Sequence, residues 1–257
     1  MFESGLLNLS QSHLNLLDLC PPKFQQVYLD RLGSIPDPKQ QETMEWGSRF
    51  HLLMQQRELA LPIEPFLAND SELNASIKEL IKAVPELIES DPNIWREAEH
   101  YRTLGYGNFV LSVIYDLLVA QENKATILDW KTYRKPQKRN KLASNWQTRL
   151  YMYVLAETSE YSPKQIQMTY WFVKSGKPTN VTFNYSQTLH QQTERDLSFL
   201  LSQLETWLQN YQQNEVDLPH KPNCQDCPYY QSLCEQDSFD RHQELIDAIA
   251  EIEEISI

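Results

Sequence analysis

The chain has 257 residues, 41% hydrophobic and 11% aromatic, so it can bury the core of one large domain or two small ones. We expect one domain, because 6 glycines and 14 prolines leave no room for a low-complexity linker and the composition excludes a disordered chain. The net charge of -12 argues against a nucleic-acid partner unless basic residues gather in one segment, since phosphate binding depends on Lys and Arg.

Signals for export or membrane insertion are missing from the sequence pattern. Residues 1–15 lack a basic leader followed by an apolar run, so we expect no signal peptide. The most apolar stretch, residues 109–120, is too short to span a bilayer and contains Asp116. We therefore expect a soluble, cytoplasmic protein with no membrane partner, and the sequence gives no oligomeric state.

Helical signals dominate the first part of the chain. Ser10 can cap a helix that Pro21 breaks, and Asp37 with Pro38 reads as the N-cap and first position of another. Pro85 is expected to kink or end a later helix. The predicted helical stretches cover residues 10–19, 24–32, 38–59 and 72–88.

Strand signals begin near Glu97. Residues that favour strands alternate from Phe109 to Val119, and a second such run, 125–130, follows a polar turn at 121–124, which predicts a hairpin. The succession of helix, three strands, helix and strand predicts an α/β fold. The remaining predicted elements are strands over 165–173 and 179–185 and helices over 144–158 and 187–212.

The hairpin brings two acidic residues together. A turn centred between Glu122 and Asn123 places Asp116 directly opposite Asp129, and opposed residues on antiparallel strands have Cβ atoms about 5 Å apart. Two carboxylates this close repel each other, and a divalent cation bridging them offsets that cost. Lys131 follows Asp129 by two residues and so lies on the same face of the strand.

This constellation suits phosphodiester hydrolysis. Carboxylate oxygens hold Mg²⁺ or Mn²⁺, the metal activates water and polarises the phosphate, and Lys131 stabilises the developing negative charge. A structural alternative stays open for each part: Asp116 as a hydrogen-bonded strand residue, and Asp129 with Lys131 as a surface ion pair of small energy.

Four cysteines lie near the two ends of the chain. Cys20 stands alone at the front, and Cys224, Cys227 and Cys234 cluster near the other end. In a reducing cytoplasm four thiols indicate metal ligation, as zinc or an iron-sulfur cluster, rather than disulfides. Buried, unrelated thiols are the alternative for any one pair.

Basic residues gather after the hairpin. Seven lie between Lys131 and Arg149 with no acidic residue among them, which leaves 16 basic and 35 acidic residues elsewhere. Such a run is either a solvated face or a path for the phosphate backbone. Tyr133 and Trp146 are candidate platforms for base stacking, or core residues. The candidate phosphate contacts are Arg134, Lys135, Lys138, Arg139 and Lys141.

Several motifs together resemble the PD-(D/E)XK nuclease superfamily, and within it the RecB-like and CRISPR-associated iron-sulfur nucleases. The resemblance covers nearly the whole chain. The segments that carry it are Leu9-Ser10-Gln11-Ser12, Cys20-Pro21-Pro22-Lys23-Phe24, Gly47-Ser48-Arg49-Phe50-His51, Tyr115-Asp116, Leu128-Asp129-Trp130-Lys131-Thr132, Gln147 with Tyr151, and Cys224-Gln225-Asp226-Cys227-Pro228-Tyr229. Two departures are Val113, where the family has glycine, and the six residues between Cys227 and Cys234, one more than the commonest pattern.

The resemblance implies an α/β, restriction-endonuclease-like core, with a mixed central sheet flanked by helices. The resemblance also implies a single domain over 1–257. This domain would comprise a helical part (1–95), a catalytic sheet and helix (96–185), and a C-terminal helix with a cysteine-rich cluster segment (186–257). The implied activity is Mg²⁺- or Mn²⁺-dependent cleavage of DNA, on single-stranded or frayed ends, by an exonuclease rather than an endonuclease. The implied pathways are DNA repair or recombination and CRISPR adaptation, with a helicase or adaptation proteins as partners.

The same resemblance assigns the site residues. Glu99 would be the acidic residue on the preceding strand, with Glu97 as its near rival. The implied catalytic residues are Glu99, Asp116, Asp129, Lys131, Gln147 and Tyr151; the metal ligands are His51, Asp116 and Asp129; and a structural [4Fe-4S] cluster, or Zn²⁺ in its place, is bound by Cys20, Cys224, Cys227 and Cys234. Two rival hypotheses are a non-catalytic nucleic-acid-binding module and a structural zinc protein.

Overall fold

The computed structural model describes residues 6–33, 38–88, 94–133, 137–174 and 177–221. Its contacts divide the chain into two compact units. Unit 1 contains residues 1–35, 105–111 and 192–257, and unit 2 contains residues 36–104 and 112–191. Three long elements have residues in both units.

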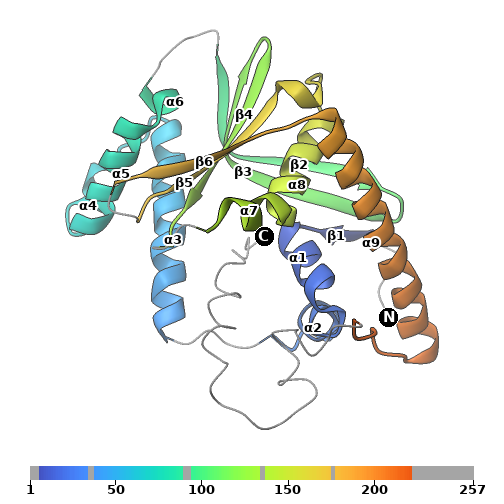
Figure 1. Ribbon diagram of the computed structural model, residues 1–257. Coiled ribbons are helices and arrows are strands. Elements are labelled where there is room, and N and C mark those ends of the chain that lie inside the picture. The colour runs from blue at the N-terminus through green and yellow to red at the C-terminus, as the bar shows by residue number, and fades with distance from the viewer. Residues whose placement is uncertain (1–5, 34–37, 89–93, 134–136, 175–176, 222–257) are drawn as a thin grey trace. The chain divides into compact units, whose positions relative to one another are not determined.

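A mixed sheet is the framework of unit 2 (Figure 1). Strands β3 and β4 are antiparallel, β4 and β5 parallel, and β5 and β6 antiparallel, while β2 pairs with β3. Strand β4 is central, and all of its residues after Lys124 are buried, which fits its run of β-branched and aromatic residues. The strands are β2 (Trp95–Tyr106), β3 (Phe109–Gln121), β4 (Lys124–Lys131), β5 (Ile166–Phe172) and β6 (Thr179–Asn184).

The hairpin register agrees with the sequence prediction. Leu117 pairs with Leu128, Val119 with Thr126, and Gln121 with Lys124, so the paired residue numbers sum to the expected value throughout. The polar turn therefore fixes which residues of β3 and β4 share a face.

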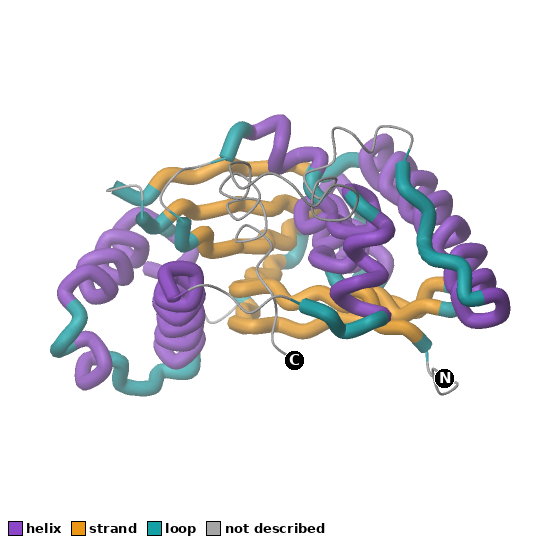
Figure 2. Tube along the Cα trace, turned by 90° about the horizontal axis from the view of Figure 1, so that it is seen from below, coloured by secondary structure: helices purple, strands orange, loops and turns teal. Residues whose placement is uncertain are grey.

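Helices cover both faces of this sheet. Helices α3, α4 and α5 lie side by side in both views (Figures 1 and 2), and Phe50 and Ile77 pack with Leu117, Leu128 and Trp130 in one core. Helix α5 ends at Ala83 and α6 begins at Pro85, because proline cannot donate the next helical hydrogen bond. The helices of unit 2 are α3 (Pro38–Glu58), α4 (Glu64–Leu67), α5 (Ser71–Ala83), α6 (Pro85–Ile88), α7 (Arg139–Ser144) and α8 (Trp146–Glu157), with a 3₁₀ turn at Pro163–Gln165.

Unit 1 begins with a strand that the sequence analysis had not predicted. Strand β1 (Leu7–Leu9) pairs in parallel with Phe109–Leu111. Helix α1 (Gln11–Leu19) then starts as expected after Ser10, whose side chain and backbone form a capping box with His13. The further elements are α2 (Pro21–Phe24), a π-helix (Gln25–Leu29) and α9 (Gln187–Asn214), whose first residues belong to unit 2.

The segment that follows α9 is tied to these N-terminal helices. Gln25 donates to Asp217 (2.7 Å) and accepts from the backbone of Leu218 (2.7 Å). Lys221 forms an ion pair of 2.9 Å with Asp18. Residues 217–221 are thereby held close to the turn between α1 and α2.

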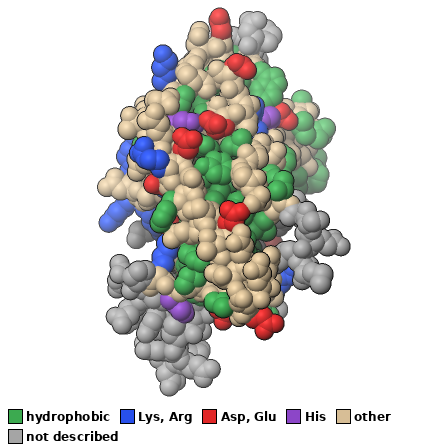
Figure 3. All heavy atoms as spheres, turned by 90° about the vertical axis from the view of Figure 1, so that its right-hand side faces the viewer, with side chains coloured by type: hydrophobic (Ala, Val, Ile, Leu, Met, Phe, Trp, Pro, Cys, Tyr) green, Lys and Arg blue, Asp and Glu red, His purple; other side chains and the backbone are tan. Residues whose placement is uncertain are grey.

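Charge is dispersed over the face drawn in Figure 3, where Asp and Glu side chains are scattered among polar and hydrophobic residues instead of forming one block. Among the described residues, no helix is both long and apolar enough to cross a bilayer.

Candidate active site

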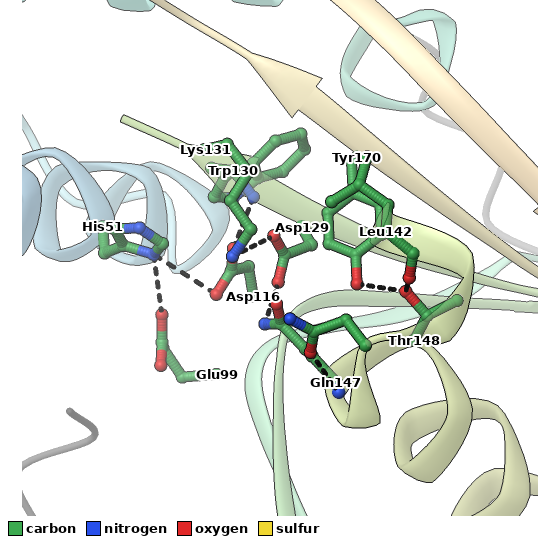
Figure 4. A network of polar contacts seen from close by, with 11 residues as sticks. His51, Glu99, Asp116, Asp129, Trp130, Lys131, Leu142, Gln147, Thr148 and Tyr170 are labelled. Atoms are coloured by element: carbon green, nitrogen blue, oxygen red, sulfur yellow. Dashed lines mark hydrogen bonds and ion pairs between the residues drawn. The ribbon is translucent and has the colours of Figure 1, made fainter. Parts of the chain in front are cut away.

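Three potential metal ligands converge within unit 2. His51 comes from α3, Glu99 from β2 and Asp116 from β3 (Figure 4). One ligand atom from each lies within 4.8 Å of the others. The Nδ1 atom of His51 lies 3.2 Å from Asp116 Oδ1 and 3.9 Å from Glu99 Oε1. We call these three residues the open half of the site, because each side chain remains partly exposed.

Helix α3 approaches the sheet closely one turn before His51. A Cβ atom on Gly47 would lie 3.0 Å from Thr132 Oγ1, tighter than an ordinary contact. Phe50 is fully buried beside it and anchors the helix to the core. The absence of a side chain at Gly47 therefore sets how near His51 can come to the strands.

Glu99 reaches the site through a left-handed backbone conformation. Its φ is 51°, which is uncommon for a residue with a side chain. Arg96 also contacts α3, through Glu58 (2.9 Å), although residues three apart in a regular strand point to opposite faces. The turn at Glu99 re-aims its carboxylate toward the same helix, as a bulge does. Its rival Glu97 instead pairs with His100 (2.7 Å) and is mostly exposed.

Asp116 connects the open half to the neighbouring strand. Its Oδ2 atom accepts a hydrogen bond of 2.5 Å from the backbone N–H of Trp130, while Oδ1 faces His51. The described backbone pairing of the hairpin ends at Leu117 and Leu128, so at the next position the Asp116 side chain joins β3 to β4. Asp116 is thus a hydrogen-bonded strand residue, as the structural alternative predicted, but only one of its two carboxylate oxygens makes that hydrogen bond.

Asp129 and Lys131 form a second cluster, the buried half of the site. The Lys131 ammonium lies 2.9 Å from Asp129 Oδ1, and the two side chains are only 5% and 2% exposed. Gln147 donates to the other oxygen, Asp129 Oδ2, at 2.7 Å. The alternative of an exposed surface pair is therefore wrong. A cation shared between Asp116 and Asp129 stays a prediction, since Glu99 is the third member of the cluster around His51.

Helix α8 supplies the polar partners of the buried half. Asn145 caps this helix by accepting a hydrogen bond from the backbone N–H of Gln147 (2.8 Å), so Gln147 lies in the first turn of the helix. Tyr151 lies one turn further and hydrogen-bonds to Gln147. Burial, followed by the charges of Asp129 and Asp116, raises the pKa of Tyr151 well above its usual value. Tyr151 is therefore a protonated phenol that shares a hydrogen bond with Gln147.

The basic segment contains a short helix that was not predicted, α7. Lys138 and Lys141 are exposed, and the Arg139 guanidinium lies 4.6 Å from the ring centre of Phe183. Arg134 and Lys135 lie outside the described residues. Trp146 is only 3% exposed and Arg149 covers its ring, so of the two alternatives for this residue the structure supports a core residue. Tyr133 packs edge-on against Phe172.

Of the four cysteines, the structure describes one. Cys20 is buried between α1 and α2 in unit 1. The other three lie outside the described residues, so the ligation of a cluster by the four cysteines stays a prediction.

The residues of the open half fit a divalent cation. Two carboxylates and an imidazole form a compact set of hard and borderline donors, which suits Mg²⁺ and Mn²⁺. The ammonium of Lys131, paired with Asp129, supplies the positive charge of the buried half. The site thus combines carboxylates and a lysine from the strands of a mixed sheet with an imidazole from helix α3.

A model of the PD-(D/E)XK nuclease superfamily matches residues 8–235. The chain therefore belongs to this superfamily. A solved structure named "Putative exonuclease", from Eubacterium rectale, shares 10% sequence identity with a TM-score of 0.53, covering 87% of this chain and 90% of that chain. At this identity the likeness shows the fold alone. A structure named SSO0001 is 13% identical with a TM-score of 0.33, covering 75% of this chain and 76% of that chain, and supports no conclusion. No curated protein matches the chain.

Proposed function

We propose that this protein is a Mg²⁺- or Mn²⁺-dependent deoxyribonuclease whose site is made of the open and buried halves described above. The observation that carries the proposal is the His51, Glu99 and Asp116 cluster, with ligand atoms within 4.8 Å, in a chain of the PD-(D/E)XK superfamily. A non-catalytic binding module would not need both a cluster of metal-ligating side chains and a buried lysine in one site.

The residues have separable roles. His51, Glu99 and Asp116 would hold the divalent cation, which when bound polarises a phosphate oxygen and makes water more acidic. The Lys131 ammonium stabilises the negative charge that develops on the phosphate oxygens during attack. Asp129 fixes Lys131 from one side, and Gln147 fixes Asp129. Lys131 is thereby oriented before the substrate arrives, so little reorganisation is needed during the reaction.

Burial of the lysine favours a flexible substrate. Lys131 and Asp129 are almost fully buried, whereas His51 and Glu99 are partly exposed, so we infer that a phosphate approaches from the side of His51 and Glu99. A single strand or a frayed end bends into such a site more easily than a duplex. Lys138 and Lys141, exposed nearby in sequence, would bind the adjoining backbone and raise affinity at low salt. We infer from the resemblance that cleavage starts at strand ends.

The test is a cleavage assay on labelled linear single strands, linear duplexes and circular single strands, with Mg²⁺, Mn²⁺, Ca²⁺ or a chelator. We expect degradation of linear single strands with Mg²⁺ or Mn²⁺, binding without cleavage with Ca²⁺, and intact circles. Cut circles would replace the exonuclease with an endonuclease. An inactive wild-type protein that still binds DNA would favour the non-catalytic module.

We also propose that Cys20, Cys224, Cys227 and Cys234 bind a structural [4Fe-4S] cluster. The support is that Lys221 contacts Asp18, two residues before Cys20, and Cys224 follows Lys221 by three residues. Three residues of chain span at most about 10 Å, so the Lys221–Asp18 contact is compatible with ligation of one cluster by both ends of the sequence.

Metal analysis separates the cluster from its zinc alternative. Protein purified without oxygen should be brown and contain iron and sulfide, whereas a zinc protein is colourless. Stoichiometric zinc without iron after such a purification would establish the alternative. The pathways of DNA repair or recombination and CRISPR adaptation, with a helicase or adaptation proteins as partners, remain predictions from the resemblance, and gene neighbourhood tests them.

A further inference from the structure

Lys131 has a second neighbour that no sequence motif indicated. Its ammonium lies 5.5 Å from the ring centre of Tyr170, as well as 2.9 Å from Asp129. Asp129 and Tyr170 are direct partners in the parallel pairing of β4 and β5, so their side chains and that of Lys131 emerge on one face of the sheet. Tyr170 is fully buried. A buried cation over an aromatic face is attracted by the ring, more strongly than at an exposed site.

The far end of the same ring is held by helix α8. The Tyr170 hydroxyl lies 2.7 Å from Thr148 Oγ1, and the Thr148 hydroxyl donates to the backbone carbonyl of Leu142 at 2.6 Å (Figure 4). A threonine hydroxyl has one hydrogen, so Tyr170 donates to Thr148. Burial, followed by the Asp129 charge, raises the pKa of Tyr170, so the phenol keeps the hydrogen that this bond needs.

Two consecutive residues of α8 therefore contact both supports of the lysine. Gln147 binds Asp129, and Thr148 binds Tyr170. Leu142 lies in α7, the short helix that also carries Arg139 and Lys141. A chain of contacts runs from Leu142 through Thr148 and Tyr170 to Lys131. It connects the basic segment to the ammonium that, in the proposed function, stabilises the charge on the phosphate.

We propose that Tyr170 is a positioning residue for Lys131. Its ring limits the orientations of a side chain with four rotatable bonds, and the hydrogen bond to Thr148 fixes the ring. This proposal rests on the proposed nuclease function for its kinetic test, and its spectroscopic test does not depend on cleavage.

The kinetic test compares Tyr170→Leu, which removes the ring, with Tyr170→Phe, which keeps it. We expect Tyr170→Leu to lower kcat roughly 10- to 30-fold with KM and Ca²⁺-supported DNA affinity unchanged, and Tyr170→Phe to stay much closer to wild type. Thr148→Val should lower kcat less than Tyr170→Leu, and Thr148→Ser should match wild type. The control is Trp171→Leu, because Trp171 is the next buried aromatic in β5 but packs in the core on the opposite face.

A double variant separates positioning from general packing. Lys131→Ala with Tyr170→Leu should cleave no more slowly than Lys131→Ala alone, because the ring has nothing left to position. If Tyr170→Leu slows the Lys131→Ala protein by the same factor as the wild type, the ring acts elsewhere and the proposal is overturned.

The second test reads the lysine itself. In protein labelled with ¹³C-lysine, the ε-methylene signal assigned by its loss in Lys131→Ala should be shifted upfield by the Tyr170 ring. Tyr170→Leu should abolish this shift and Trp171→Leu should preserve it. An inactive wild type with this shift would contradict the nuclease function but keep the positioning role, and an active wild type without it would do the reverse.

Discussion

The two units of the chain differ in what they contribute. Unit 2 contains every described side chain of the site, from His51 on α3 to Tyr170 on β5. Of the predicted site residues that the structure describes, unit 1 contains only Cys20, and its polar contacts tie residues 217–221 to the N-terminal helices. The proposed catalytic site and the proposed cluster ligand Cys20 therefore belong to different parts of the chain. Substitutions in unit 1 should therefore change stability, and substitutions in the site should change cleavage.

The largest expected effect on stability comes from Cys20→Ser in unit 1. A cluster that joins Cys20 to the last cysteines closes nearly the whole chain into one loop, which as a cross-link would stabilise folding by on the order of 4–5 kcal/mol, an upper guide for thiolate ligation. The variant should lose its iron and visible absorption and melt at a lower temperature. Its folded fraction should still cleave DNA. Full iron content with unchanged melting would show that Cys20 is not a ligand.

The next effect belongs to the site in unit 2. Asp116→Asn and Lys131→Ala should each lower cleavage by roughly 100- to 1000-fold, because each removes metal binding or charge stabilisation in the transition state. The double variant should be little worse than either single one. For Asp116→Asn, melting temperature and iron content serve as controls and should stay near wild type, whereas Lys131→Ala leaves the buried Asp129 carboxylate unpaired and should also melt at a lower temperature. Near-normal turnover by Asp116→Asn with Mg²⁺ would rule out the open half as the metal site.

Asp129→Asn should behave differently from Asp116→Asn. It leaves the buried Lys131 without its carboxylate, and an uncompensated buried charge costs about 3–5 kcal/mol. We therefore expect lost cleavage together with a lower melting temperature. Thermal unfolding of the two asparagine variants side by side measures this contrast, and equal melting temperatures would contradict the burial of the Asp129 pair.

A smaller effect should come from Gly47→Ala, which forces a Cβ atom against Thr132 Oγ1 at 3.0 Å. Overpacking of this kind costs about 1–3 kcal/mol and should move His51 away from Asp116, lowering both stability and cleavage. Adding Thr132→Ala should restore both, because the next contact, Thr132 Cβ, is an ordinary 3.9 Å away. Gly105→Ala is the matched control, since nothing lies within 4 Å of its added Cβ. Equal effects of Gly47→Ala with and without Thr132→Ala would exclude this steric mechanism.

The smallest effect concerns acid stability in unit 1. Burial lowers the pKa of His13 from 6.5 to about 4, so between these values the unfolded chain binds a proton that the folded chain does not. The contribution of His13 to the free energy of unfolding is therefore fully present above pH 6.5 and is lost as the pH falls toward 4. The loss is about 1 kcal/mol over the first pH unit. Denaturant unfolding across this window measures the slope.

His13→Gln provides the control for that slope. Glutamine at this position keeps the capping box with Ser10 but does not titrate. The difference in unfolding free energy between wild type and His13→Gln should shrink as the pH falls. A difference independent of pH would mean that His13 binds its proton equally well in the folded and the unfolded chain, so that burial does not lower its pKa.

The hairpin and its charges could be predicted from sequence because they depend on local signals. A polar turn fixed the register, and Asp116, Asp129 and Lys131 followed from it. Helices beginning after Ser10 and at Pro38 were predicted because capping residues and prolines act over a few positions.

The rest depended on contacts between distant segments. Alternation places Glu97 and Glu99 on the same face of β2, and only the left-handed backbone at Glu99 separates them. The parallel register of β4 and β5, which brings Tyr170 to Lys131, is set by packing and not by a turn. Burial of Trp146 under Arg149 and the approach of Gly47 to Thr132 likewise arise only when helices meet the sheet.

The most direct measurement is a Mn²⁺ binding titration, with free Mn²⁺ followed by electron paramagnetic resonance, on the wild type, Asp116→Asn and Cys20→Ser. The account predicts that Asp116→Asn weakens Mn²⁺ binding at least about tenfold, whereas the folded Cys20→Ser protein binds Mn²⁺ as the wild type does. Unchanged Mn²⁺ affinity in Asp116→Asn, or its loss in folded Cys20→Ser, would contradict the assignment of the metal site to His51, Glu99 and Asp116.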